Sequence, residues 1–239
     1  MFKYCTSLSS IDFPSLYSIA VLTASHTAAD SMFARCSELR DVNLSNLLFI
    51  RGGKATAQYF MYACPKLSSV NLDSLSSVPQ EDAMRYAFAN CDSLGEISFP
   101  ALSAPTGKRG MQHIFENDYN LSVASFPELS LVQNTQLDAA FNNCSALVSA
   151  NFPKVLSVYQ QGFNNAFTNC VKLSTLYFPS LSYLGPSAFG NSTYRAFVGC
   201  DSLTSIHFRA DAQAQVEACD GYDVNFGAPR GDFQFIYDL

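Results

Sequence analysis

The chain has 239 residues, of which 48% are hydrophobic and only 14% are charged, and its formal net charge is −6. A chain this apolar and this weakly charged folds around a core rather than staying disordered. Its acidic balance leaves no basic stripe to neutralise phosphates, which argues against nucleic acid as a partner. No apolar run approaches the roughly 18 residues of a membrane span.

A spaced pattern begins at the start of the chain and recurs into its last fifth. Its first copy consists of Phe2, Cys5, Leu8, Ile11, Phe13, Pro14 and Leu16. The spacing returns in seven further copies, anchored at Cys36, Cys64, Cys91, Asp118, Cys144, Cys170 and Cys200. Successive anchors lie 26 to 31 residues apart. Repeats of this length indicate a solenoid, in which each coil buries its apolar face against the next.

Each copy contains the signals of two extended segments and one compact segment. The part Leu-x-x-Ile-x-Phe ends in alternating inward and outward residues, which predicts a short strand. The proline that follows marks the strand's exit, because it donates no hydrogen bond to a ladder. A second extended run comes next, such as 16–19 or 181–184. The small-residue stretches before the anchors, such as 84–90 and 163–169, are predicted to form a helical turn or a short helix.

The repeat pattern stops after Phe208, and a segment of different composition follows. Residues 210–219 suit a short helix, and residues 233–237 alternate like a final strand. We therefore divide the chain into a repeat region, 1–209, and a C-terminal capping segment, 210–239, of the same structural domain, because a terminal repeat needs a polar outer face. The first coil shows no cap, and its exposed strand edge favours self-association through the N-terminal end.

One slot of the repeat holds seven of the eight cysteines: Cys5, Cys36, Cys64, Cys91, Cys144, Cys170 and Cys200. The main interpretation is a column of buried thiols, because cysteine packs as a small apolar residue. Adjacent slots are expected about 4.8 Å apart, so disulfides between coils remain an alternative on spacing alone. The sequence has no C-x-x-C and no histidine paired with the column, so we predict no metal and no cofactor. Cys219 lies outside the column and is expected to be an accessible thiol.

The outward positions of the predicted strands form one surface of mostly small polar side chains. From this surface we select six candidates for ligand binding: Asp12, Asn43, Asn71, Asn151, Tyr177 and His207. Tyr177 and His207 rank first because they offer the most contact area, and an ordinary solvated sheet face is the alternative. Neither a phosphate-binding glycine motif nor the spacing of a catalytic triad is present, so we predict no enzyme activity and no catalytic residue.

The pattern F-x-x-C-x-x-L-x-x-I-x-F-P-x-L resembles the leucine-rich repeat of BspA-like bacterial surface proteins, also known as the Treponema type, from Phe2 to Phe208. The resemblance implies an α+β leucine-rich-repeat solenoid of about eight coils with short parallel strands and a C-terminal cap. It also implies a non-enzymatic binding module, extracellular or on the cell surface, that contacts a host protein or a glycan through the strand face. The alternative is a structural spacer or receptor-binding segment of a larger assembly, such as a phage tail or cell-wall array.

Overall fold

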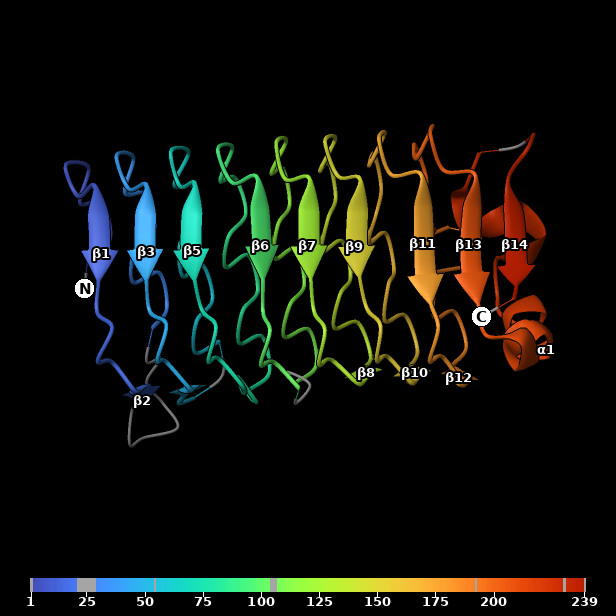
Figure 1. The fold of residues 1–239 in the computed structure, drawn as a ribbon, viewed down its shortest axis with the longest axis horizontal. Helices are drawn as coiled ribbons and strands as arrows, with labels where there is room; N and C mark the ends of the chain where they lie inside the picture. The colour runs from blue at the N-terminus through green and yellow to red at the C-terminus, as the bar shows by residue number, and fades with distance from the viewer. Residues whose placement is uncertain are drawn as a thin grey trace.

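The chain winds into a parallel solenoid of about seven turns with very little helix, close to the eight coils predicted (Figure 1). The computed structural model describes residues 2–20, 29–53, 55–103, 107–191, 193–229 and 231–238. Within these residues no helix is long and apolar enough to cross a membrane. The fold agrees with the solenoid that the repeat predicts.

A front row of short strands forms what we call the strand face (Figure 1). Its strands are β1 (Ser10–Asp12), β3 (Asp41–Asn43), β5 (Ser69–Asn71), β6 (Glu96–Ser98), β7 (Val123–Ser125), β9 (Ser149–Asn151), β11 (Thr175–Phe178), β13 (Ser205–Phe208) and β14 (Gln234–Tyr237). They pair in parallel and in register in three groups, β1-β3-β5, β6-β7-β9 and β11-β13-β14. In β1 and β11 the inward residues Ile11 and Leu176 are buried, as the period-two alternation predicts.

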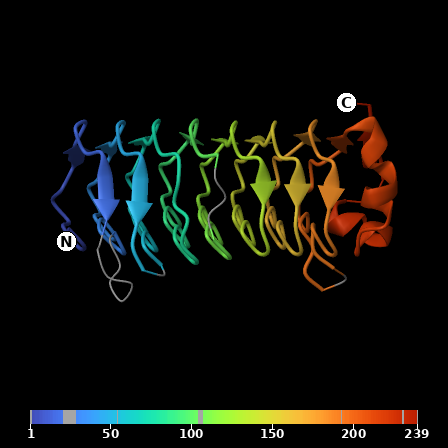
Figure 2. The same ribbon diagram turned by 90° about the horizontal axis from the view of Figure 1, so that it is seen from below.

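A second set of short strands lies along the side of the solenoid that is lowest in Figure 1 and that faces the viewer in Figure 2. It comes from the extended runs that follow the first strands: β2 (Ser18–Ala20), β4 (Phe49–Arg51), β8 (Leu131–Val132), β10 (Ser157–Val158) and β12 (Tyr183–Leu184). Here β2 pairs with β4, and β8, β10 and β12 form a small parallel sheet. In the coils that contain both strands, the chain therefore turns from one sheet into the other, and the core lies inside this bend.

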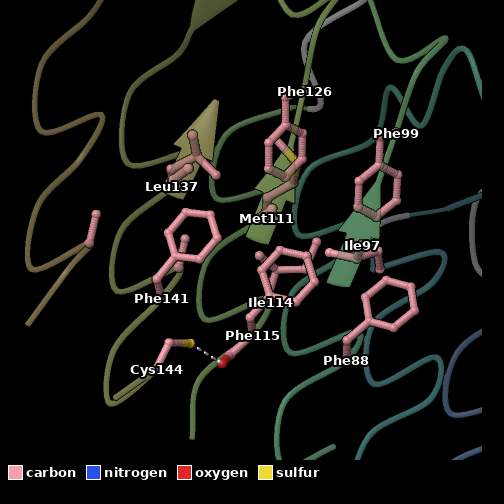
Figure 3. Close-up of a cluster of buried hydrophobic side chains, with 14 of the residues drawn as sticks. Phe88, Ile97, Phe99, Met111, Ile114, Phe115, Phe126, Leu137, Phe141 and Cys144 are labelled. Atoms are coloured by element: carbon pink, nitrogen blue, oxygen red, sulfur yellow. Dashed lines mark hydrogen bonds between the residues drawn. The ribbon is translucent and has the colours of Figure 1, made fainter. Parts of the chain in front are cut away.

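Phenylalanine columns fill the core (Figure 3). One column places Phe88, Phe115 and Phe141 at ring-centroid separations of 5.8 and 5.5 Å. A second column stacks Phe99 on Phe126 at 5.3 Å, with the ring planes 10° apart. All five side chains are fully buried. Stacking each slot of the repeat on its equivalent removes from water the apolar face that a single coil leaves exposed, which is why the fold needs many coils.

The segments that precede the anchors lie on one side of the solenoid, which we call the turn face. Residues 84–90 and 163–169 belong to it, and they form successions of turns and bends rather than the short helix that was predicted. Successive N–H groups alternate in direction. Ala57 donates to Ala83 of the next coil at 2.7 Å and Tyr59 to Arg85 at 3.0 Å, whereas Gln58 donates within its own coil to Ala55 at 3.2 Å. Half of the N–H groups are thus used between coils, and a helix would need them within the coil.

The turns depend on left-handed backbone at every fourth residue. Tyr59 and Ala63 have φ of 55° and 56°, and Tyr86 and Asn90 in the next coil have 56° and 62°. Asparagine tolerates this conformation better than most residues. One row of the turn face accordingly carries a ladder of side-chain hydrogen bonds, with separations of 3.3, 2.8 and 2.7 Å, through Asn90, Asn117, Asn143 and Asn169.

The C-terminal segment folds against the last coil. It contains η1 (Ala210–Ala212), α1 (Gln213–Glu217) and η2 (Tyr222–Gly227) before β14. The predicted helix and final strand are both present, and β14 extends the front sheet by pairing with β13, with Phe235 opposite Ile206. Phe226 is buried among the last core rings, 5.4 Å from Phe189. The apolar side of the last coil is thereby covered.

Candidate recognition surface

The N-terminal part of the strand face brings three of the six candidate residues together. Asp12, Asn43 and Asn71 are register partners on β1, β3 and β5, so their side chains form one row. They line a shallow hollow of about 460 Å³ that also includes Asp41. Asn43 donates its Nδ2 hydrogen to Oδ1 of Asp12 at 2.8 Å. This end of the face therefore presents oxygen acceptors and amides.

Two of these residues have a structural task as well. Oδ1 of Asn43 accepts a hydrogen bond from the N–H of Ser45 at 3.2 Å, and Oδ1 of Asn71 accepts one from the N–H of Asp73 at 3.1 Å. Such bonds to the residue two positions on close a turn at the end of the strand. Most other coils have proline at this position, which has no N–H. Asn43 and Asn71 thus make locally the turn that proline makes elsewhere.

The C-terminal part of the strand face carries an aromatic platform formed by Tyr177 and His207. Their rings are stacked with centroids 4.7 Å apart and planes 25° apart. Nδ1 of His207 lies 3.1 Å from Oδ1 of Asp238, and Nε2 lies 3.2 Å from Oγ of Ser205. These contacts fix the imidazole, and Tyr177 lies against it with 51% of its surface exposed. The pair is a rigid platform with a half-exposed ring.

The sixth candidate, Asn151, lies between these two parts. It is exposed at the end of β9, and its Oδ1 accepts a hydrogen bond from the hydroxyl of Ser149 at 2.9 Å. The strands of the hollow and those of the platform lie at opposite ends of the front row (Figure 1). The six residues therefore share one face but do not form one pocket.

The cysteine slot forms a column along the solenoid. In six coils the thiol points to a carbonyl oxygen of the preceding coil: that of Phe2, Phe33, Met61, Phe115, Phe141 or Phe167, at 2.9 to 3.2 Å. Figure 3 shows this bond between Cys144 and Phe115. All eight cysteines are free thiols. Burial raises the pKa of Cys64 and Cys200 to about 12, so these thiols are protonated and unreactive at neutral pH.

Two further residues of the sequence analysis are placed by the structure. Asp118, which replaces the thiol in one coil, is fully buried. Cys219 is also buried, near the carbonyl oxygen of Gly185, because α1 packs over β12; the expectation of an accessible thiol was wrong. Within the described residues no group of three histidine, cysteine or acidic side chains is arranged to hold a metal ion.

The turn face contains an arrangement that the sequence analysis missed. Tyr59 stacks on Tyr86 with centroids 5.3 Å apart, and Tyr86 stacks on His113 at 4.5 Å, with planes within 6° in both pairs. The three residues recur at the period of the repeat, and so do the asparagines that precede the anchors. That periodicity was a signal both for the aromatic stack and for the asparagine ladder. What the sequence did not reveal is that these slots point outward.

A family model and solved structures connect this architecture to known proteins. The model of the BspA type leucine rich repeat region matches in six copies, over residues 1–128 and 54–195. The crystal structure of the T. pallidum leucine rich repeat protein is similar, with 25% identity and a TM-score of 0.52, over 81% of this chain and 77% of that one. No curated protein matches the chain.

Two further structures match over nearly the whole chain but superpose poorly. A leucine rich cell surface protein from Faecalibacterium prausnitzii A2-165 has 14% identity and a TM-score of 0.32, over 99% of this chain and 74% of that one. A leucine-rich repeat protein from Bacteroides ovatus has 15% identity and a TM-score of 0.23, over 100% and 80%. The family match and the T. pallidum structure carry the assignment: the chain belongs to the BspA-type leucine-rich repeat family.

Proposed function

We propose that the chain is a non-enzymatic binding module of a bacterial surface or secreted protein, which recognises a host protein or a glycan through the strand face. Leucine-rich repeat solenoids as a class are binding scaffolds, because stacked coils create long rigid surfaces. The surface or secreted location is part of the proposal and follows from the resemblance of the repeat to that of BspA-like surface proteins.

The observation that carries the proposal is the platform of Tyr177 and His207. Tyrosine supplies a large, rigid and amphipathic contact area and loses little conformational entropy on binding. Here the ring is already held against an imidazole that Asp238 and Ser205 fix. A ligand that covers Tyr177 therefore meets a preorganised site, and preorganisation lowers the cost of binding.

The test is a glycan array and a host-protein array, each probed with the chain and with the double variant Tyr177→Ala, His207→Ala. Tyr119→Ala is the matched control, because Tyr119 is about as exposed as Tyr177 but lies in a turn outside the strand face. We expect a bound ligand that the double variant loses and the control keeps. Equal binding by all three proteins would contradict a site at the platform.

A structural role in a larger assembly is the second candidate. One observation favours it: the N-terminal end has an apolar hollow of about 780 Å³, bordered by Phe13, Leu16, Ile19 and Met32. In later coils the slots of Phe13, Leu16 and Ile19 hold fully buried side chains, such as Leu44, Leu47 and Ile50. A second copy of the chain docked on this end would cover the hollow. A blank result on both arrays would favour this role.

A further inference from the structure

A second hollow, of about 290 Å³, lies on the turn face near the N-terminal end, away from the strand face. Its aromatic walls are Tyr4, Tyr59 and Tyr62, and Lys3, Ser31 and Arg35 border it. Tyr4, Arg35 and Tyr59 have left-handed backbone, with φ of 63°, 61° and 55°, and their side chains are at least partly exposed. None of the six belongs to the surface proposed above.

Arg35 lies between two of the rings. Its Cζ atom is 5.7 Å from the ring centroid of Tyr4 and 5.8 Å from that of Tyr62. Tyr62 meets Tyr59 edge to face, with centroids 5.3 Å apart and planes 83° apart. Packing against rings holds a guanidinium by its faces, and its N–H groups, which lie in its plane, stay available to a ligand.

Two cations, Lys3 and Arg35, border this hollow of an acidic chain. The chain carries a net charge of −6, and five of its described cations pair with acids, among them Lys66 with Glu38 and Arg109 with Asp82. Within the described residues neither Lys3 nor Arg35 has an ion-pair partner, and Nζ of Lys3 lies 5.5 Å from the ring of Tyr4. The adjacent acid, Asp30, accepts a hydrogen bond from the hydroxyl of Ser31 at 3.1 Å. Two cations thus face the hollow without a carboxylate partner.

We propose that this hollow binds a carboxylate-bearing sugar, such as a uronic acid unit of an acidic glycan. The fork of Arg35 matches a carboxylate in a bidentate manner, and Lys3 adds a second positive charge. The tyrosine rings provide flat apolar walls for the C–H face of a sugar ring, and their hydroxyl groups pair with sugar hydroxyls. The volume lies at the small end of ligand sites and suits a single ring.

The tyrosine walls decide between a sugar and an acidic peptide. A glutamate or aspartate side chain would use the fork of Arg35, but it has no ring to lie against Tyr59 and Tyr62. A uronic acid uses the cation and the walls together. Its binding should therefore exceed both that of a neutral sugar, which lacks the carboxylate, and that of an acidic peptide, which lacks the ring.

The experiment is a calorimetric titration of the full chain with glucuronic acid, with glucose and with a short oligoglutamate peptide, at low salt. The key variant is Arg35→Asn, because Asn90, Asn117 and Asn143 occupy the same row with the same backbone, so this change preserves the fold. Arg40→Asn is the matched control: Arg40 is an exposed cation of the same coil that pairs with Glu38 instead. Thermal melts confirm folding of each variant, and Tyr62→Ala removes one wall as an independent change.

We expect glucuronic acid to bind about tenfold more tightly than glucose and than the peptide. Arg35→Asn and Tyr62→Ala should each lose most of this binding, whereas Arg40→Asn and the double variant of the strand face should keep it. Equal binding of glucose would overturn the role of the carboxylate, and equal binding of the peptide would overturn the sugar. If Arg35→Asn and Arg40→Asn lose the same amount of glucuronic acid binding, the binding reflects only the net charge of the chain, and the site is overturned. Because the strand-face variant is a separate arm, failure here leaves the proposed function untouched.

Discussion

The carboxylate of Asp118 accepts a hydrogen bond from the backbone N–H of Cys91 at 2.7 Å, and its second oxygen is buried without a partner among the described residues. Asp118 stands where six other coils place a thiol that donates to a carbonyl oxygen. Burial raises the pKa of this carboxyl group well above its ordinary range. One coil therefore buries an acid in a column whose other members are neutral donors. This acid should lower the free energy of unfolding of the chain.

Replacing the acid with the residue of the column should stabilise the protein. Asp118→Cys removes an unpaired buried oxygen and restores a thiol that can donate to the carbonyl of Phe88. The N–H of Cys91, which loses its acceptor, can turn to the same carbonyl, as the N–H of Cys144 does to that of Phe141 at 3.0 Å. An unsatisfied buried polar group costs about 1–3 kcal/mol, so we expect a gain of that size in the free energy of unfolding at neutral pH. Urea denaturation measures it as a higher midpoint with an unchanged slope. Asp201→Ser, the same exposed change beside the column in another coil, is the control. An unchanged or lower midpoint for Asp118→Cys would contradict the argument.

The same carboxyl group should make stability depend on pH. A carboxyl group whose pKa is raised by folding, from its ordinary 3.8, binds its proton more tightly in the folded chain. Its contribution to stability is fully present below pH 3.8 and is lost as the pH rises through the folded-state pKa. The advantage of Asp118→Cys over the parent chain should therefore be largest at neutral pH and shrink on acidification. Burial also raises the pKa of Asp138, but that group is common to both proteins and cancels in the difference. A difference that does not change with pH would show that Asp118 is not the cause.

The asparagine ladder should stabilise the folded chain in two ways, through the left-handed backbone that asparagine tolerates and through its side-chain hydrogen bonds. Asn143 has φ of 64°, donates to Asn117 and accepts from Asn169. Asn143→Ala loses both bonds and strains the left-handed backbone, at an expected cost of about 2–4 kcal/mol. Asn143→Gly loses the same bonds without the strain and should cost less. Thermal and urea unfolding of the two variants separates the cost of the lost hydrogen bonds from the cost of the backbone strain. If glycine proves as costly as alanine, the conformation is not the reason for asparagine in this row.

The chain should dimerise through its N-terminal end. Phe13 is 44% exposed there and borders the apolar hollow that a second copy would cover. Burying this surface is favourable at about 25 cal/mol per Å². Light scattering across a concentration series should give a dimer for the parent chain and a monomer for Phe13→Asp, a change at a site that is already exposed. A clean monomer of the parent chain at high concentration would rule out this contact.

The solenoid was predictable from the sequence because each coil repeats one spaced pattern. The period-two alternation identified Ile11 and Leu176 as inward residues, and both are buried. The six candidate residues of the strand face could be selected by the same alternation, because a strand has only two faces. The sequence also contained a signal for the turns at Asn43 and Asn71. The residue two positions after each is not proline, so it has an N–H that the asparagine side chain can bind. Whether any of the six binds a ligand stays a prediction.

The turn face was decided by the tertiary structure. The composition of 84–90 predicted a helix. In a stack of coils, however, alternate N–H groups can donate to the neighbouring coil, as those of Ala57 and Tyr59 do. The same stacking placed Tyr86 on His113 and put Arg35 between two tyrosines. The sequence by itself determined the coil, its length and its inward residues, because those depend on spacing along one chain. Which outward side chains meet depends on how coils stack on one another, and only the folded solenoid determines that.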